Sequence, residues 1–196
     1  MSDPTVSSVA AGGNVRDGNL EFQNTIEGVI IRTLGNKLTP ELKAKLRASG
    51  LDLDKKLLPA YPAVDFHRWV AIAAEYVYPN VGATEAVRLF GRQSLVGLGE
   101  TMIGKAMKLS LTLIGPRRAL QRAGRSFRSN NNYIVVEAKE LTPTSMELKF
   151  NEVYSLPSYY QGVLEGACML IGAKQCTVRL DSMLGNGARF IAEWQD

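Results

Sequence analysis

The chain has 196 residues, 45% of them hydrophobic, and a formal net charge of +4 at pH 7. This length fits one domain with a substantial core. The sequence contains no run as long as the roughly 18 apolar residues of a membrane helix, so we expect no membrane span. Residues 1–20 are small, polar and glycine-rich, which predicts a disordered lead rather than a signal peptide. We therefore expect a cytoplasmic protein with a single domain over residues 21–196.

The first predicted elements are a strand and a short helix. Residues 27–34 are apolar and β-branched, which favours a strand. Thr39 is a suitable N-cap, and Pro40 suits the first helical turn, so a helix should run from there to about Ala48. Asp65 is expected to cap a further apolar helix that ends before Pro79.

Residues 84–115 form the longest predicted helical region. Its several glycines make a straight, unbroken helix doubtful, and Pro116 forces a break or a new start. The side chains expected to face inward are Ala86, Leu89, Phe90, Met102, Met107 and Leu111. We place the whole helical part of the domain at about residues 39–128.

A strongly basic segment ends this helical part, since residues 105–128 contain no acid. On a helix starting at Pro116, four arginines should form one stripe, which could bind an anion or a partner. These are Arg118, Arg122, Arg125 and Arg128. We favour instead that acids elsewhere in the fold, such as Glu137 or Glu140, pair with the stripe, and a simple solvated helix face is a further alternative to a binding surface. Nucleic acid is not favoured, because only Phe127 is interleaved with the arginines.

From residue 132 onwards, apolar and polar residues begin to alternate with a period of two, and residues 132–195 predict a ββαββ unit. Two alternating segments, 133–139 and 146–153, predict a hairpin with its loop at 141–144. A helix should begin at Pro157, followed by strands over 176–181 and 189–194. The fold class is therefore α+β, with an N-terminal strand and a helical region packed on an antiparallel sheet.

Gly162 and Gly166 lie one turn apart on the predicted C-terminal helix. Each glycine costs a helix roughly 1 kcal/mol relative to alanine, so the pair predicts a neighbour packed close to the backbone. A sheet is the favoured neighbour, with a second helix or a ligand as alternatives.

The sequence contains no recognisable catalytic or metal-binding motif. Its one histidine, His67, lies among apolar residues, which favours a structural role. Its two cysteines, Cys168 and Cys176, are expected to be free and largely buried. We therefore expect no catalytic residue. We also expect no metal site, because a zinc site needs about four ligands and this chain offers two cysteines and one distant histidine.

The apolar, methionine-rich helical material and the nearby tyrosines could enclose a pocket for a small molecule. The candidate pocket residues are Phe90, Met102, Met107, Tyr133, Tyr159, Tyr160 and Met169. Residues of these types at helical spacing also form ordinary protein cores.

Several segments carry a resemblance to known families. The helix YYQGVLEGACMLIG, the strand after it, the turn at residues 185–187 and the closing FIAEW resemble the 4-vinyl reductase-type domain. They are also similar to the haem-nitric-oxide-binding domain and to the Bet-type subunits of the TRAPP tethering complex. Over its full length, with LLPAYP, LFGR and GPRRALQR, the chain resembles a paralogous family of similar length from myxobacteria.

The resemblance implies an α/β architecture, but the motifs that bind cofactors in those families are missing. Haem-binding members place a histidine before the ββ pair, where this chain has RALQRAGRSF with Gln121. Their Tyr-x-Ser-x-Arg motif does not start at Tyr154, Tyr159 or Tyr160. Zinc-containing members place cysteines on the final hairpin, where this chain has Arg179, Asp181 and Arg189. We therefore expect no cofactor.

Two functions follow as hypotheses. The first is a non-enzymatic domain that senses or binds an apolar small molecule or a lipid. The second is a ligand-free scaffold that forms a homodimer or tethers partners, as the TRAPP-type subunits do. An enzyme would require a reactive Cys168 or Cys176, for which the sequence offers no activating partner.

Overall fold

The computed structural model describes residues 18–100 and 102–195. Within these ranges, the side chains at 96–100, 102–108, 110–112, 123 and 126 are not described. Most of the predicted lead at residues 1–20 lies outside the described residues, and the first strand begins at Leu20.

The N-terminal half is mainly helical. A short strand, β1, pairs antiparallel with β2. The elements of this half are β1 (Leu20–Phe22), α1 (Gln23–Thr25), η1 (Ile26–Arg32), η2 (Gly35–Lys37), α2 (Pro40–Ala48), β2 (Ala60–Pro62) and α3 (Ala63–Val77). Among the described residues, no helix is both long and apolar enough to cross a membrane.

The strand predicted over residues 27–34 is wrong, because this segment is helical and η1 has π-helical hydrogen bonding. Ile26, Ile30 and Leu34 recur at four-residue spacing, and all three are buried in the core. This spacing places them on one face of a helix. Burial of that face outweighs the preference of β-branched residues for strands.

Helix α2 confirms its predicted start, since the Thr39 hydroxyl accepts a hydrogen bond from the backbone N–H of Leu42 at 3.2 Å. The prediction for α3 is wrong at its cap. That helix begins at Ala63, directly after Pro62, so Asp65 lies inside the first turn rather than at the N-cap. There the carboxylate still interacts favourably with the helix dipole.

Three helices connect the two halves: α4 (Ala83–Glu100), α5 (Met102–Gln121) and α6 (Ala123–Arg128). The predicted break near Pro116 is confirmed. Gly115 adopts φ 76° and ψ 165°, a conformation outside the helical region that glycine tolerates best. Of the residues expected to face inward, Ala86 and Phe90 are buried and Leu89 is half-buried. The remaining ones, Met102, Met107 and Leu111, lie outside the described side chains.

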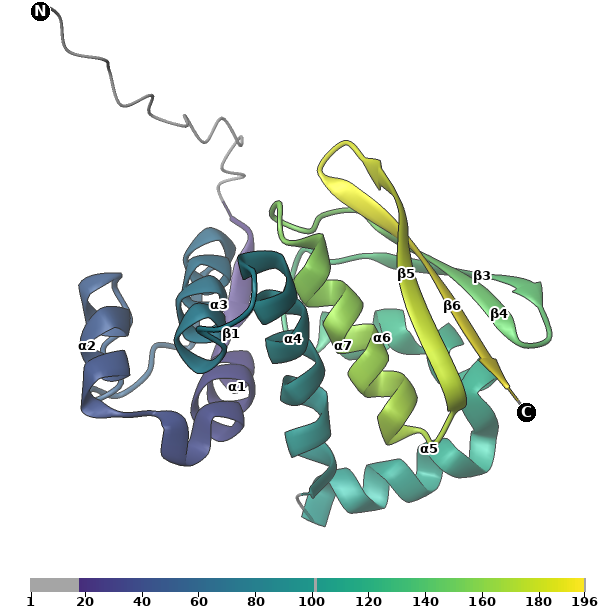
Figure 1. The fold of residues 1–196 in the computed structure, drawn as a ribbon, viewed down its shortest axis with the longest axis horizontal. Helices are drawn as coiled ribbons and strands as arrows, with labels where there is room; N and C mark the ends of the chain where they lie inside the picture. The colour runs from purple at the N-terminus through teal and green to yellow at the C-terminus, as the bar shows by residue number, and fades with distance from the viewer. Residues whose placement is uncertain (1–17, 101, 196) are drawn as a thin grey trace, which may run out of the picture.

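The C-terminal half is the predicted ββαββ unit, so the α+β fold class is confirmed (Figure 1). Its elements are β3 (Val136–Thr142), β4 (Ser145–Phe150), α7 (Pro157–Leu170), β5 (Lys174–Leu184) and β6 (Gly187–Gln195). The four strands form an antiparallel sheet in the order β3-β4-β6-β5. Met146, Leu148 and Phe150 alternate along β4 and bury their side chains in the core.

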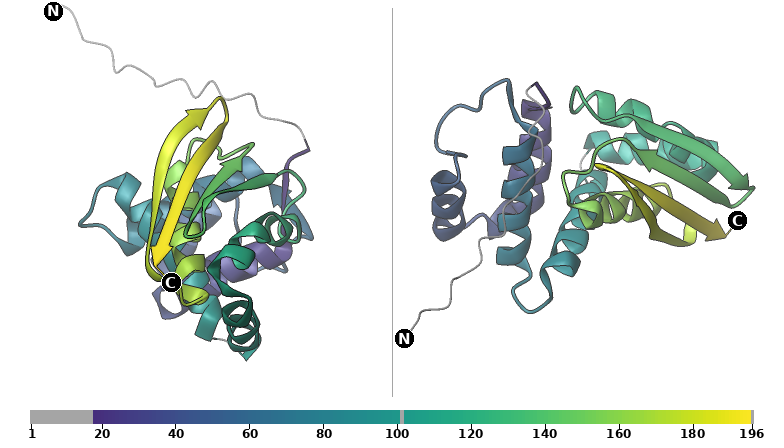
Figure 2. Two further views of the ribbon diagram at one scale, coloured as in Figure 1. Left: turned by 90° about the vertical axis from the view of Figure 1, so that its right-hand side faces the viewer. Right: turned by 90° about the horizontal axis from the view of Figure 1, so that it is seen from above.

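Helices α4 and α7 join the two halves of the molecule. The N-terminal helices and the four-stranded sheet lie on opposite sides of this helix pair (Figure 2, right). Gly162 and Gly166 face α4, where a Cβ at Gly166 would lie only 2.6 Å from the carbonyl oxygen of Arg92. Gly91 of α4 fits equally closely against the backbone of Tyr159. The glycine face therefore packs on a helix, not on the sheet as favoured from the sequence.

Candidate functional site

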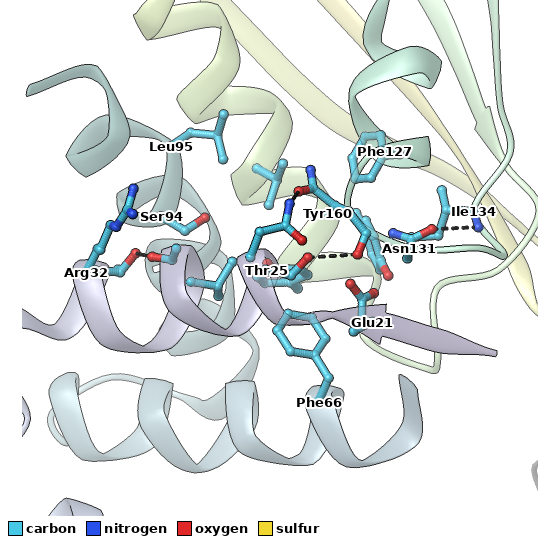
Figure 3. A pocket seen from close by; sticks show the side chains of 17 residues that line it. Glu21, Thr25, Arg32, Phe66, Ser94, Leu95, Phe127, Asn131, Ile134 and Tyr160 are labelled. Carbon is cyan, nitrogen blue, oxygen red and sulfur yellow. Dashed lines mark hydrogen bonds between the residues drawn. The ribbon is translucent and has the colours of Figure 1, made fainter. Parts of the chain in front are cut away.

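A cavity of about 290 Å³ lies between η1, α3, α4, α7 and the segment 127–134. We call it the central cavity. Most of its wall is apolar or aromatic (Figure 3). These lining residues are Val29, Phe66, Leu95, Phe127, Ile134, Tyr159, Tyr160 and Val163. Such a wall suits an apolar ligand.

One face of the helix through α1 and η1 forms a wall of the central cavity. Thr25, Gly28, Val29, Arg32 and Thr33 all line it. Their spacing of three and four residues puts them on one helical face, opposite the face buried in the core. The π-helical turn at Thr33, whose N–H reaches the carbonyl of Gly28, therefore borders the cavity. Such turns occur frequently at functional sites.

Helices α3 and α7 supply the aromatic part of the wall. Phe66 meets Tyr159 edge to face, with ring centroids 6.0 Å apart. Tyr160 follows on α7, and Val163 lies one turn further. Because α3 belongs to the N-terminal half and α7 to the C-terminal half, a molecule in the cavity would contact both halves.

The main polar feature of the wall is the carboxyl group of Glu21, which lies on β1 at one end of the cavity (Figure 3). Glu21 is only 2% exposed. The hydroxyl of Tyr133 donates to Oε1 at 2.5 Å. Burial raises the pKa of Glu21 to about 8, although hydrogen bonds from neighbouring side chains partly oppose this. Of the described residues, none gives Oε2 a hydrogen bond.

His67 lies beside the cavity as a structural residue. Its Nδ1 lies 2.7 Å from the carbonyl oxygen of Ala63, which can only accept, so Nδ1 carries the proton. Nε2 is then the acceptor for the hydroxyl of Tyr160 at 2.8 Å. Burial lowers the pKa of His67 to about 4, so the ring is neutral at pH 7. The ring also stacks on Tyr154 at 4.7 Å.

The structure separates the predicted pocket residues into groups. Tyr159 and Tyr160 line the central cavity, and Tyr133 lies behind it, bonded to Glu21. Phe90 is fully buried in the core and does not line the cavity. Met169 is 55% exposed and lies on the surface, outside the cavity. The side chains of Met102 and Met107 are outside the described ones.

The predicted arginine stripe does not form one continuous helix, because α5 ends at Gln121 and α6 starts after Arg122. Its members Arg118, Arg122, Arg125 and Arg128 are all exposed. Within the described part of the chain, no carboxylate pairs with any of them. The expected acid does reach this region, but Glu140 pairs with the flanking Arg117 at 2.7 Å.

Sequence reasoning missed much of the cavity wall. The residues it did not single out include Glu21, Thr25, Arg32, Phe66, Ser94, Leu95, Asn131 and Ile134. If residues 25–33 are taken as a helix, the shared face of Thr25, Val29 and Arg32 can be recognised from their spacing. The role of Glu21 had no local signal, since its partner Tyr133 lies 112 residues further along the chain.

The cysteines are free: Cys168 is buried and Cys176 is half-buried. Over residues 18–100 and 102–195, no three His, Cys, Asp or Glu side chains gather so that they could hold a metal ion. The central cavity itself presents apolar side chains and several polar groups, among them the carboxyl group of Glu21.

Comparison with known proteins places the chain in a family. Residues 19–195 match the family described as "Protein of unknown function (DUF2378)". The chain belongs to this family. A search of the curated proteins found no match.

Solved structures of H-NOX domains share the fold. One, described as "Structural insights into the molecular mechanism of H-NOX activation", aligns with a TM-score of 0.63 at 14% identity and covers 90% of this chain and 97% of that one. An "oxygen binding H-NOX domain related to soluble guanylate cyclases" aligns with a TM-score of 0.59 at 15% identity, over 88% of this chain and 94% of that one. A third, from a study of "heme distortion in the H-NOX family", aligns with a TM-score of 0.57 at 16% identity, over 88% of this chain and 94% of that one.

These likenesses support the haem-nitric-oxide-binding part of the expected resemblance. They give no support to its 4-vinyl reductase-type or TRAPP parts. At such low identity they establish the fold of the DUF2378 chain but not its function.

The described residues that line the central cavity do not fit a haem. Haem iron is held by His, Cys, Met or Tyr. No described His, Cys or Met lines the cavity, and both ring nitrogens of His67 are already bonded within the protein. Burial raises the pKa of Tyr159 and of Tyr160 well above the ordinary value, which disfavours the phenolate that would bind iron.

Proposed function

We propose that this chain is a non-enzymatic domain that binds and senses a small, mostly apolar molecule in the central cavity. The observation that carries the proposal is the cavity itself, whose apolar and aromatic side chains are interrupted by polar ones such as Glu21, Asn131 and Arg32. Its volume of about 290 Å³ is just below the roughly 300–1,000 Å³ of ligand pockets, so the ligand is compact rather than a whole lipid.

Sensing requires that binding favours one conformation over another. The cavity suits this role because its wall combines η1 and α3 from the N-terminal half with α7 from the C-terminal half. A ligand that contacts both halves stabilises the arrangement in which they close around it. The chain shares its fold with H-NOX domains whose descriptions mention activation and oxygen binding, which agrees with such a role.

Native mass spectrometry of the full chain purified from its own host tests this proposal. We expect a species heavier than the chain by the mass of one small molecule, which dissociates on denaturation. The matched control is Val163→Phe, which adds volume at a position that lines the cavity. The proposal fails if the wild-type chain carries no small molecule and also binds no apolar compound added to it.

The alternative of a dimerising scaffold has one supporting observation. Strand β5 lies at an edge of the sheet and exposes Leu180, Met183 and Leu184. An exposed apolar edge strand can pair with a second chain. Light scattering after size-exclusion chromatography should then give a dimer mass for the wild type and a monomer mass for Leu180→Lys. A wild-type monomer at high concentration would rule this alternative out.

A further inference from the structure

The carboxyl group of Glu21 is buried, half-satisfied and directed at the central cavity. Oε1 accepts the hydrogen bond of Tyr133 at 2.5 Å, while Oε2 has no partner among the described residues. Thr25 and Asn131 lie close enough to lower the pKa of this carboxyl group, but neither has hydrogen-bond geometry to Oε2, and the Thr25 hydroxyl donates to the carbonyl oxygen of Asn130 at 2.8 Å. An unpaired polar atom at a buried position is expensive to maintain. A ligand could supply the missing partner.

The proton of this carboxyl group belongs on Oε2. Among the described side chains, no cation acts on Glu21, so burial favours its neutral form. Arg32 also lines the cavity, but it lies at the opposite end (Figure 3). Because Oε1 already accepts from Tyr133, the neutral acid presents an O–H group from Oε2. Its missing partner is therefore a hydrogen-bond acceptor.

We propose that Glu21 is the polar anchor of the central cavity, and that the ligand is a compact, uncharged, mostly apolar molecule whose carbonyl oxygen accepts a hydrogen bond from Oε2. A ketone, ester or lactone meets this description. Its apolar part lies along Phe66, Ile134 and Val163. This assignment rests on the proposed function, because it requires that the cavity holds a ligand.

Three probes of nearly the same shape test the assignment by NMR titration of the wild-type chain at pH 7. Acetophenone has a carbonyl acceptor, α-methylstyrene has a CH₂ group in its place, and 1-phenylethylammonium has a cationic donor. Acetophenone should bind roughly three- to tenfold more tightly than α-methylstyrene, the effect of one net hydrogen bond. The ammonium probe should bind most weakly, because no ionised carboxylate receives it.

Two variants locate the effect. Glu21→Gln keeps an N–H donor at the same place and should retain the preference for acetophenone. Glu21→Met removes the donor, so acetophenone and α-methylstyrene should bind equally well. If Glu21→Met does not fold, the comparison of the three probes with the wild-type chain still decides the question.

The possible failures are distinguishable. If acetophenone and α-methylstyrene bind the wild type equally, the cavity holds apolar ligands but Glu21 is not their anchor. If the ammonium probe binds most tightly, Glu21 is ionised and the carbonyl assignment is wrong. If no probe binds, this assignment is overturned, and the proposed function is overturned as well when native mass spectrometry of the host-purified chain also finds no bound molecule.

Discussion

At the scale of single residues, the buried side chains of Glu21 and His67 are both neutral at pH 7, because their pKa values are shifted in opposite directions. The pKa of Glu21 is raised from 4.5 to about 8, and that of His67 is lowered from 6.5 to about 4, in both cases mainly by burial. Each shift makes stability depend on pH, in opposite directions. For Glu21, the unfolded chain ionises first, so stability is full below about pH 4.5 and is lost as pH rises towards 8. For His67, stability is full above pH 6.5 and is lost as pH falls towards 4.

Between pH 6.5 and 8, the raised pKa of Glu21 should therefore make the free energy of unfolding fall as pH rises. The tyrosines around Glu21 do not titrate in this range, because burial raises the pKa of Tyr133, Tyr159 and Tyr160. The slope can reach about 1.4 kcal/mol per pH unit for one proton. Urea unfolding at several pH values measures it, and Glu21→Gln should flatten it. An equal slope in both proteins would show that Glu21 is not buried as a neutral acid.

At the scale of elements, the α4–α7 contact depends on the absence of side chains at its glycines. A Cβ at Gly166 would lie 2.6 Å from the carbonyl oxygen of Arg92 and 2.9 Å from Cβ of Leu95. Gly166→Leu should therefore lower stability by at least about 1–3 kcal/mol, because the two helices must move apart. Gly82→Leu is the matched control, since a Cβ there meets no atom within 4 Å. Thermal unfolding of both variants checks this, and an unchanged midpoint for Gly166→Leu would refute the close packing.

The basic region gives a second prediction at this scale. Arg118→Glu combined with Arg122→Glu should change stability by no more than about 0.5 kcal/mol, because neither arginine pairs with a described carboxylate. Arg117→Glu is the comparison, since it replaces the ion pair with Glu140 by a repulsion. Chemical denaturation measures all three proteins. A clear loss of stability in the double variant would show that the arginine stripe is paired within the fold.

The elements that the sequence predicted well have strong local signals. Thr39 and Pro40 mark the start of α2, and the alternating residues of β3 and β4 predict their hairpin. The strand predicted over residues 27–34 is wrong because β-branched side chains favour a strand locally, whereas the helical spacing of Ile26 and Ile30 matters only once a core covers that face. The burial of Glu21 also arises from tertiary contacts, so no local pattern could indicate it.

At the scale of the whole molecule, the central cavity lies where the two halves meet. Helices α4 and α7 hold these halves together through their glycine contact, and the cavity is enclosed by elements from both sides. Cavity-filling variants should therefore remove ligand binding without removing the fold. Val163→Phe is the direct choice, because Val163 is buried on α7 and lines the cavity. Val81→Phe is its control, since it adds the same ring at an exposed position.

A methyl NMR titration of the wild-type chain, Val163→Phe and Val81→Phe with acetophenone shows directly whether the central cavity binds a ligand. We predict saturable shifts of the methyl groups of Val29, Leu95 and Ile134 in the wild type and in Val81→Phe. Binding to Val163→Phe should be at least roughly tenfold weaker, since the added ring occupies the ligand volume. Either no saturable shift at these methyl groups or equal binding by Val163→Phe would mean that the central cavity is not a ligand site.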